Sequence, residues 1–429
     1  TQPKQIATLS NTPLAAGSDP QRVSVGEEIE YRLHTLLPVA LLRNFIIRDE
    51  LPAGLRCSEA PEINLSEEPY DDAGFDPGGP VTPTCSGNVV EWNFGDQRVT
   101  NGNVGNRYDF EIGFIARVDN TAAVNDGDVL SNGDPATAAT ASYIDEANNS
   151  VVLDFGQVDV IVREPAIALT KAFNVVNADA GDILTVMVTA ENTGTATAYN
   201  LRVLDDLRGS KLRYAGNTSG TDPPDILDSL GDNQPVFGWN RPIAPGDIIE
   251  FTFDVLVEVA AQPHEILDNT VQADWTSLPG YKTALNSSGE IGDDGSETGM
   301  RIGALPNAGD AVNDYETEAS AQTEVPAAIL SKTDLDPALT PAIGTHKAFQ
   351  SDIRLPEGTT NGVIAADSLD SGGVSYVLTR NTDFDVTYTF EGIAVINGST
   401  AVEEADFNAF PADGAGGSIV WDIGTVVTN

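Results

Sequence analysis

Apolar residues recur at every second position along several segments of the chain. Tyr108, Phe110, Ile112 and Phe114 alternate with polar or small residues, and the same pattern runs over 249–259. Period-two alternation is typical of a strand that buries one face. No stretch shows a helical period with caps at its ends. The pattern therefore predicts an all-β chain.

Turn-forming residues divide these strands into short segments. Asn132-Gly133-Asp134 and Leu207-Arg208-Gly209 are two examples. Short strands separated by turns are typical of antiparallel β-sandwiches of the immunoglobulin-like kind.

Three similar segments indicate an internal repeat. They begin at Pro3, Pro165 and Pro326, which lie 162 and 161 residues apart, and the last two segments reach a lysine, Lys171 or Lys332. A glycine that opens a strand follows each segment, and a tryptophan lies at a corresponding place in each repeat. We expect these tryptophans, Trp92, Trp239 and Trp421, to be core residues and not platforms for a ligand. The repeat predicts three units with residues 1–163, 164–324 and 325–429.

The third unit is expected to be incomplete. By the repeat spacing it stops roughly 60 residues before its expected end. Its alternating residues Val386, Tyr388 and Phe390 need a covering sheet. Either the polypeptide continues past Asn429 or a neighbouring subunit donates strands, and we favour continuation.

The charge of the chain limits the classes of molecule that it can bind. The sequence has 65 Asp and Glu residues against 22 Lys and Arg, which gives a net charge of −43. Such a chain repels nucleic acid phosphates and anionic lipid headgroups. No apolar run is long enough for a transmembrane helix, and no signal peptide is visible at Thr1. We expect no nucleic acid partner, no membrane insertion of this segment, and a mature or excised piece of a longer protein.

The two cysteines, Cys57 and Cys85, predict a disulfide. They lie 28 residues apart in loop-like sequence, and the residues between them include seven acidic and no basic side chains. A covalent link would hold such a self-repelling loop together. A disulfide also agrees with a location outside the cell.

Several short motifs resemble a known family of surface repeats. The segments Ala180-Gly-Asp-Ile-Leu-Thr-Val186, Glu191-Asn-Thr-Gly-Thr195 and Asp49-Glu-Leu-Pro-Ala-Gly-Leu55 are similar to bacterial and archaeal repeats known as domain of unknown function 11. The resemblance covers essentially the whole chain. It implies an immunoglobulin-like fold and a secreted tandem-repeat protein of a cell envelope or extracellular structure. The first unit departs from the pattern by its Cys57–Cys85 insertion and by Ser10 where the others have lysine.

Catalysis finds little support in the sequence. The three histidines, His34, His264 and His346, lie in different units, and no nucleophile elbow, phosphate-binding loop or zinc-protease motif occurs. Close acidic pairs, as a glycoside hydrolase uses, arise here from composition alone. We therefore expect no enzyme.

Calcium is the candidate cofactor, because it prefers clustered carboxylate and carbonyl oxygens. The alternative is that each acidic loop is only solvated. The candidate ligands form three clusters: Asp71, Asp72 and Asp76; Asp126, Asp128 and Asp134; and Asp293, Asp294 and Glu297.

A Lys–Asn isopeptide bond is a further hypothesis. Lys171 and Lys332 hold the same position in their first strands, and Asn269 could face one of them. The alternative is that these lysines end the strand and point to solvent.

Two functions remain open. The first is a non-enzymatic structural rod of a stalk, sheath or filament, since prolines and short linkers at the junctions stiffen tandem sandwiches. Its partners would be other copies of itself or neighbouring repeats. The second is a calcium-dependent adhesin that binds a carbohydrate or protein through loops of the first unit. Both place the chain outside the cell or at its surface.

Overall fold

All regular structure in the described residues is β-strand. Among them no helix is long and apolar enough to cross a membrane. The computed structural model describes residues 4–16, 20–57, 81, 83–86, 88–100, 102, 104–121, 123–133, 138–279, 299, 301, 315–340, 342–345, 347–368, 370–371, 374–375, 394–396 and 418–428.

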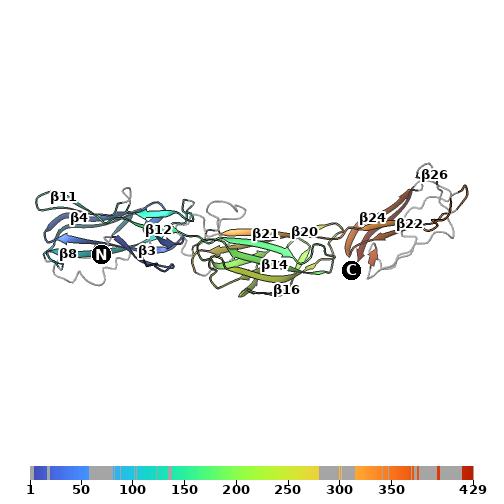
Figure 1. Ribbon diagram of the computed structural model, residues 1–429, viewed down its shortest axis with the longest axis horizontal. Helices are drawn as coiled ribbons and strands as arrows, with labels where there is room; N and C mark the ends of the chain where they lie inside the picture. The colour runs from blue at the N-terminus through green and yellow to red at the C-terminus, as the bar shows by residue number, and fades with distance from the viewer. Residues whose placement is uncertain are drawn as a thin grey trace.

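The strands of the first unit form two main sheets that pack as a sandwich (Figure 1). One sheet has the order β1 (Lys4–Leu9), β3 (Glu28–Pro38), β8 (Arg107–Val118) and β5 (Leu55–Cys57). The other has the order β11 (Ser150–Asp154), β10 (Thr140–Ile144), β4 (Leu41–Glu50), β7 (Val89–Arg98) and β6 (Thr84–Ser86). A small third sheet joins β2 (Gln21–Val23), β12 (Val158–Val162) and β9 (Val129–Asn132).

The second unit repeats this plan with two sheets. The first has the order β13 (Ile167–Phe173), β14 (Ile183–Asn192), β19 (Ile248–Val257) and β16 (Leu212–Gly220). The second has the order β17 (Ile226–Ser229), β18 (Pro235–Gly238), β15 (Tyr199–Asp205), β20 (Ile266–Thr276) and β21 (Glu316–Glu324). This strand order is that of an immunoglobulin-like sandwich.

The strands described in the third unit form smaller sheets. β22 (Ile329–Asp334) pairs with β23 (Phe349–Arg354), and β25 (Asp370–Ser371) pairs with β26 (Val374–Ser375). A third sheet has the order β24 (Gly358–Ser368), β28 (Ser418–Thr428) and β27 (Ala394–Ile396). The residues Val386, Tyr388 and Phe390 lie outside the described part of the chain.

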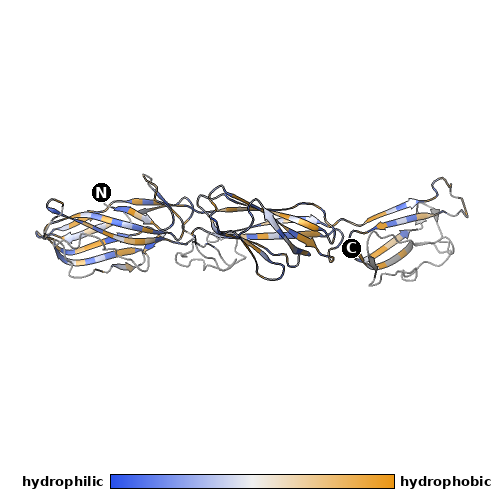
Figure 2. Cartoon of the chain, turned by 90° about the horizontal axis from the view of Figure 1, so that it is seen from below, coloured by the Kyte–Doolittle hydropathy of each residue, from blue (hydrophilic) through white to orange (hydrophobic). Residues whose placement is uncertain are grey.

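The first two units have separate hydrophobic cores. Along β8 every second residue from Tyr108 to Val118 is buried, as the alternation predicts, and apolar and polar residues alternate along the strands in Figure 2. Trp92 and Trp239 are buried in these cores, which confirms their predicted role. The side chain of Trp421 lies outside the described residues. The expected strand to Val259 is too long, because β19 ends at Val257 and Val259 is 49% exposed.

The three groups of sheets lie end to end along the long axis of the molecule (Figure 1). The predicted all-β class and tandem antiparallel sandwiches are thereby confirmed. Neighbouring groups contact each other at two junctions.

Candidate functional site

A lysine, an aspartate and an asparagine meet between the two sheets of the second unit. Lys171 lies on β13, Asp205 ends β15, and Asn269 lies on β20. Lys171 Nζ donates to both Asp205 carboxylate oxygens, at 3.1 and 3.2 Å. Asn269 Nδ2 donates to Asp205 Oδ1 at 2.6 Å, and Lys171 Nζ also contacts Asn269 Oδ1. In this second-unit trio each side chain touches the other two.

The second-unit trio is enclosed by protein. The side chains of Lys171 and Asp205 are both 0% exposed, and Asn269 is 2% exposed. Burial lowers the pKa of the Lys171 amine to about 8, although attraction to Asp205 acts the other way. Burial also raises the pKa of the Asp205 carboxyl. Both shifts favour a neutral amine beside a neutral carboxylic acid, because burial disfavours each charged form.

The first unit contains an equivalent group, the first-unit trio. It consists of Lys4 on β1, Asp49 on β4 and Asn132 at the end of β9. Lys4 Nζ lies 2.9 Å from Asp49 Oδ2, and Asn132 Nδ2 donates to the same oxygen at 3.4 Å. Asn132 is 0% exposed. Burial lowers the pKa of Lys4 and raises that of Asp49, as in the second unit.

Strand register shows that the lysines occupy one structural position. In every unit the residue that pairs with the lysine stands seven places after the glycine that opens the second strand. Lys4 therefore holds the place of Lys171, and the prediction that Ser10 stands there is wrong. The paired residues are Lys4 with Leu33, Lys171 with Val188, and Lys332 with Ser351.

The third unit shows the same lysine with a different environment. Lys332 Nζ donates to both oxygens of Asp367, at 2.6 and 2.7 Å. The Lys332 side chain is 42% exposed, in contrast to the buried amines of the other two units. The alternative that these lysines point to solvent is wrong for Lys171, because its side chain is 0% exposed.

The sequence analysis named Lys171 and Asn269 but missed the other members of both trios. A sequence motif could have identified the asparagines. Each one is the last residue of a five-residue motif that consists of an acidic residue, a β-branched residue, leucine, any residue and asparagine. The two motifs are Asp128-Val-Leu-Ser-Asn132 and Glu265-Ile-Leu-Asp-Asn269. The aspartates carry no comparable signal, because this chain is rich in them.

Side chains of the second unit bind the first unit at their junction. Arg301 Nη1 pairs with Glu164, which connects the two units, and Arg301 Nη2 donates to the Thr121 carbonyl at 2.9 Å. Tyr315 OH donates to Glu164 Oε1 at 2.9 Å. Arg301 and Tyr315 are 1% and 0% exposed. The Arg301–Glu164 ion pair is therefore shielded from water, and the hydrogen bond from Arg301 to the Thr121 carbonyl holds a loop of the first unit.

Other contacts extend the same junction on both sides. Ser277 Oγ donates to the carbonyl of Val25 at 3.0 Å. Asp126 accepts from the backbone N–H of Glu164 at 3.0 Å and contacts the Thr195 hydroxyl. The polypeptide that links the units is thus fixed to each of them.

The second and third units also meet through hydrogen bonds. Thr359 donates from its backbone N–H to the Ala261 carbonyl at 3.0 Å, and from Oγ1 to the Val259 carbonyl at 2.8 Å. Gly358 has a φ of 119°, and a Cβ there would lie 2.5 Å from the Ala261 oxygen. A glycine is required at this position, because any side chain would push the units apart.

The predicted calcium ligands are only partly described. Asp126 and Asp128 lie in the described residues, where Asp126 serves the junction and Asp128 Oδ2 accepts from the Asn125 N–H at 2.7 Å. No group of three or more metal-ligating side chains forms within the described ranges. The remaining candidates lie outside those ranges: Asp71, Asp72, Asp76, Asp134, Asp293, Asp294 and Glu297.

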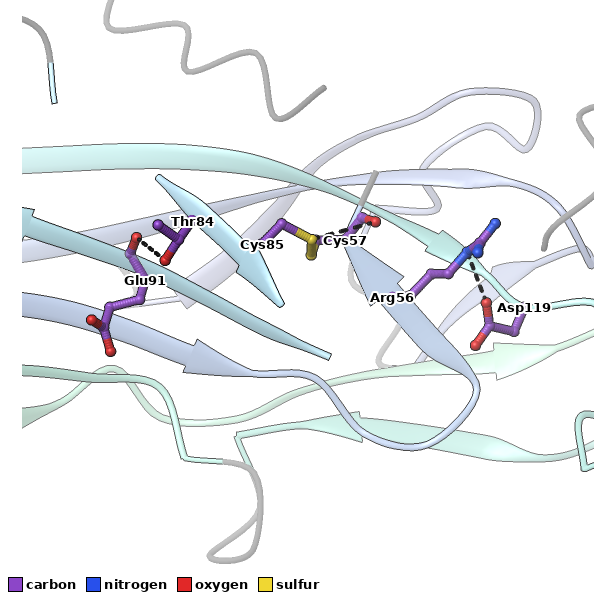
Figure 3. The surroundings of a disulfide bond; sticks show 6 residues. All are labelled: Arg56, Cys57, Thr84, Cys85, Glu91 and Asp119. Carbon is purple, nitrogen blue, oxygen red and sulfur yellow. Dashed lines mark hydrogen bonds and ion pairs between the residues drawn. A yellow bond between two sulfur atoms is a disulfide. The ribbon is translucent and has the colours of Figure 1, made fainter. Parts of the chain in front are cut away.

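The predicted disulfide between Cys57 and Cys85 is present, with Cα atoms 6.3 Å apart. Figure 3 shows it between β5 and β6, strands that belong to different sheets. Arg56, beside Cys57, forms an ion pair with Asp119 at 3.1 Å. The bond therefore links the two sheets of the first unit as well as closing the acidic loop.

No protein-family model matches the sequence, and no curated protein does. The resemblance to domain of unknown function 11 thus stays a prediction.

Several solved bacterial structures are similar to parts of the chain. One is the C-terminal domain of the Streptococcus agalactiae antigen I/II polypeptide BspA, at 10% identity and a TM-score of 0.33, over 64% of this chain and 95% of that one. Another is BcpA, the major pilin subunit of Bacillus cereus, at 12% identity and 0.27, over 68% and 62%. The Enterococcus faecalis adhesin ACE has 11% identity and 0.23, over 75% and 95%. Likenesses this distant carry no argument about function.

Proposed function

We propose that the chain is a non-enzymatic structural segment of an extracellular rod, such as a cell-surface stalk, sheath or filament. The observation that carries this proposal is the junction between the first two units. There Arg301 of the second unit is buried against Glu164 and the Thr121 carbonyl. Bending here would break the hydrogen bond from Arg301 Nη2 to the Thr121 carbonyl of the first unit and leave a buried donor unpaired, so bending at this point is costly.

The connection itself has no free linker. The carbonyl of Glu164 accepts backbone hydrogen bonds from Thr195 and Ala196 at 2.8 and 3.1 Å, and Trp275 Nε1 donates to the Pro165 carbonyl at 3.3 Å. A flexible tether would instead need unbonded, solvated residues. Because these contacts fix the linker, the two sandwiches act as one stiff segment.

Chemistry and charge support a place outside the cell. A disulfide persists in oxidising surroundings. The net charge of −43 keeps a long rod soluble and discourages nonspecific association. The resemblance to tandem surface repeats agrees with the same location.

Electron microscopy of the cells that make this chain tests the proposal. Antibodies raised against the second unit should label extended stalks, sheaths or fibres at the cell surface. Pre-immune serum is the control. Label confined to the cell interior, or restricted to compact particles, would contradict the proposed role.

The alternative is an adhesin that recognises a surface glycan or protein through the loop closed by Cys57 and Cys85. Most of that loop lies outside the described residues. Glycan and protein arrays with the whole chain, with and without a calcium chelator, separate the two functions. Saturable, chelator-sensitive binding that is lost when the loop is shortened would favour the adhesin.

A further inference from the structure

The second-unit trio combines a nucleophile, an electrophile and an acid in one enclosed space. Lys171 supplies a primary amine, Asn269 a carboxamide and Asp205 a carboxyl group, and all three are in contact. A simple ion pair would not need the asparagine. The contact of the amine with the carboxamide oxygen places the nucleophile beside the group that it would attack.

We propose that Lys171 and Asn269 join through an intramolecular amide, and that Lys4 and Asn132 do the same in the first unit. In the second unit the bond would tie β13 to β20 of the opposite sheet, and in the first unit it would tie β1 to β9 of the small third sheet. This inference rests on the geometry of the trios and does not depend on the proposed role of the protein.

The reaction balances with the residues present. The lone pair of Lys171 Nζ attacks Cγ of Asn269, the Nζ–Cγ bond forms, the Cγ–Nδ2 bond breaks, and ammonia leaves. No oxidant, cofactor or energy source is required. Holding the two groups in contact makes the attack effectively unimolecular, which removes most of the entropic barrier.

Asp205 is the catalytic residue, because it touches both reacting nitrogens. Burial lowers the pKa of Lys171 and raises that of Asp205, so the lysine can pass its proton to the aspartate and become nucleophilic. The protonated carboxyl group then delivers its proton to the departing nitrogen, which leaves as ammonia, and the carboxylate so formed takes a proton from the attacking nitrogen.

The first-unit trio supports the same reaction. Lys4 Nζ and Asn132 Nδ2 both bond to Asp49 Oδ2, so the amine and the carboxamide lie on one side of the acid. The Lys4 and Asp49 side chains are 0% exposed.

The third unit provides a contrast. Lys332 pairs with Asp367, but its side chain is 42% exposed. We assign such bonds to the first two units alone.

Intact mass spectrometry of the denatured, reduced whole chain tests the proposal. We expect the mass to fall below the sequence mass by two molecules of ammonia. Digestion should yield two branched peptides, one joining Lys171 to Asn269 and one joining Lys4 to Asn132. A chain at the full sequence mass without branched peptides would overturn the proposal.

Single substitutions show which residues form each bond. Lys171→Ala and Asn269→Ala should each restore one ammonia, as should Lys4→Ala. Asp205→Asn should restore one as well while leaving Lys171 and Asn269 in place. Lys211→Ala, which changes a partly exposed lysine outside both trios, is the matched control and should leave the deficit unchanged. Asn269→Ala keeps the Lys171–Asp205 pair, so its result stands even if the aspartate variant does not fold.

One competing reaction has the same mass. Asn132 precedes Gly133, and an Asn–Gly pair can also lose ammonia by closing a succinimide with its own backbone. Hydroxylamine cleaves a succinimide but leaves an amide cross-link intact. A deficit that disappears on this treatment, with no branched peptide at Lys4, would overturn the first-unit bond.

Discussion

Replacing Asn269 with alanine removes the electrophile of the second unit and leaves its lysine–aspartate pair intact. Without the bond the unfolded chain regains the freedom of a loop that spans 98 residues. In the chain-entropy model a link across about 100 residues contributes about 4.7 kcal/mol to stability. In a domain of this size each kcal/mol shifts the melting temperature by about 2–4 °C. The Asn269→Ala variant should therefore melt roughly 10–20 °C lower in the second unit.

Differential scanning calorimetry of the whole chain measures this shift. Hydrogen exchange of peptides from β14 and β19 assigns the transition to the second unit. Asn240→Ala, which changes an exposed asparagine on the same unit, is the control and should shift the transition by less than about 2 °C.

Denaturant unfolding separates a cross-link from a lost hydrogen bond. A cross-linked unfolded chain is more compact, so the guanidinium m-value of the second unit should rise when the link is removed. A lost hydrogen bond alone would lower the midpoint and leave the m-value unchanged. A melting shift no larger than that of Asn240→Ala, with an unchanged m-value, would refute the reasoning.

Three further predictions follow from the same structure. Arg301→Ala strands the buried Glu164 carboxylate, so we expect a loss of about 3–5 kcal/mol at the junction and a wider spread of angles between the first two units, seen by small-angle scattering. In Asn269→Ala the free Lys171 amine has a pKa lowered by burial to about 8, against 10.5 when exposed, so the unfolded chain binds more protons between these values. The stability of this variant relative to wild type should rise with pH across that window in calorimetric scans, and a flat difference would contradict the buried amine. Replacing Cys57 and Cys85 by serine should cost the first unit about 3.5 kcal/mol and lower its melting temperature by roughly 10 °C, with the second unit unchanged as the internal control.

Local patterns predicted the sheets well, because burial on one face imposes a period of two on any strand. The alternation from Tyr108 to Phe114 correctly predicted β8, and the recurring tryptophan correctly predicted core residues at Trp92 and Trp239. The limit of β19 was wrong by two residues, because Val259 turns its carbonyl to Thr359 of the next unit.

Long-range register was not predictable from the junction prolines. Lys4 lies 22 positions before Gly26, whereas Lys171 lies ten positions before Gly181, so matching the prolines displaced the lysine. The additional residues contain β2, which pairs with β12. Only the pairing of strands shows that Lys4 and Lys171 are equivalent.

The junction residues had no sequence signal at all. Arg301 lies 137 positions after Glu164, and nothing in either neighbourhood indicates an ion pair. Such contacts depend on how two finished sandwiches meet, which no local propensity encodes.

The distribution of angles between the first and second units tests the central claim most directly. Single-particle electron microscopy of the isolated chain measures it molecule by molecule. If the buried contacts of Arg301, Tyr315 and Ser277 hold the units as one stiff segment, the images should show one narrow angle in all molecules. A broad distribution, like beads on a flexible string, would contradict the account.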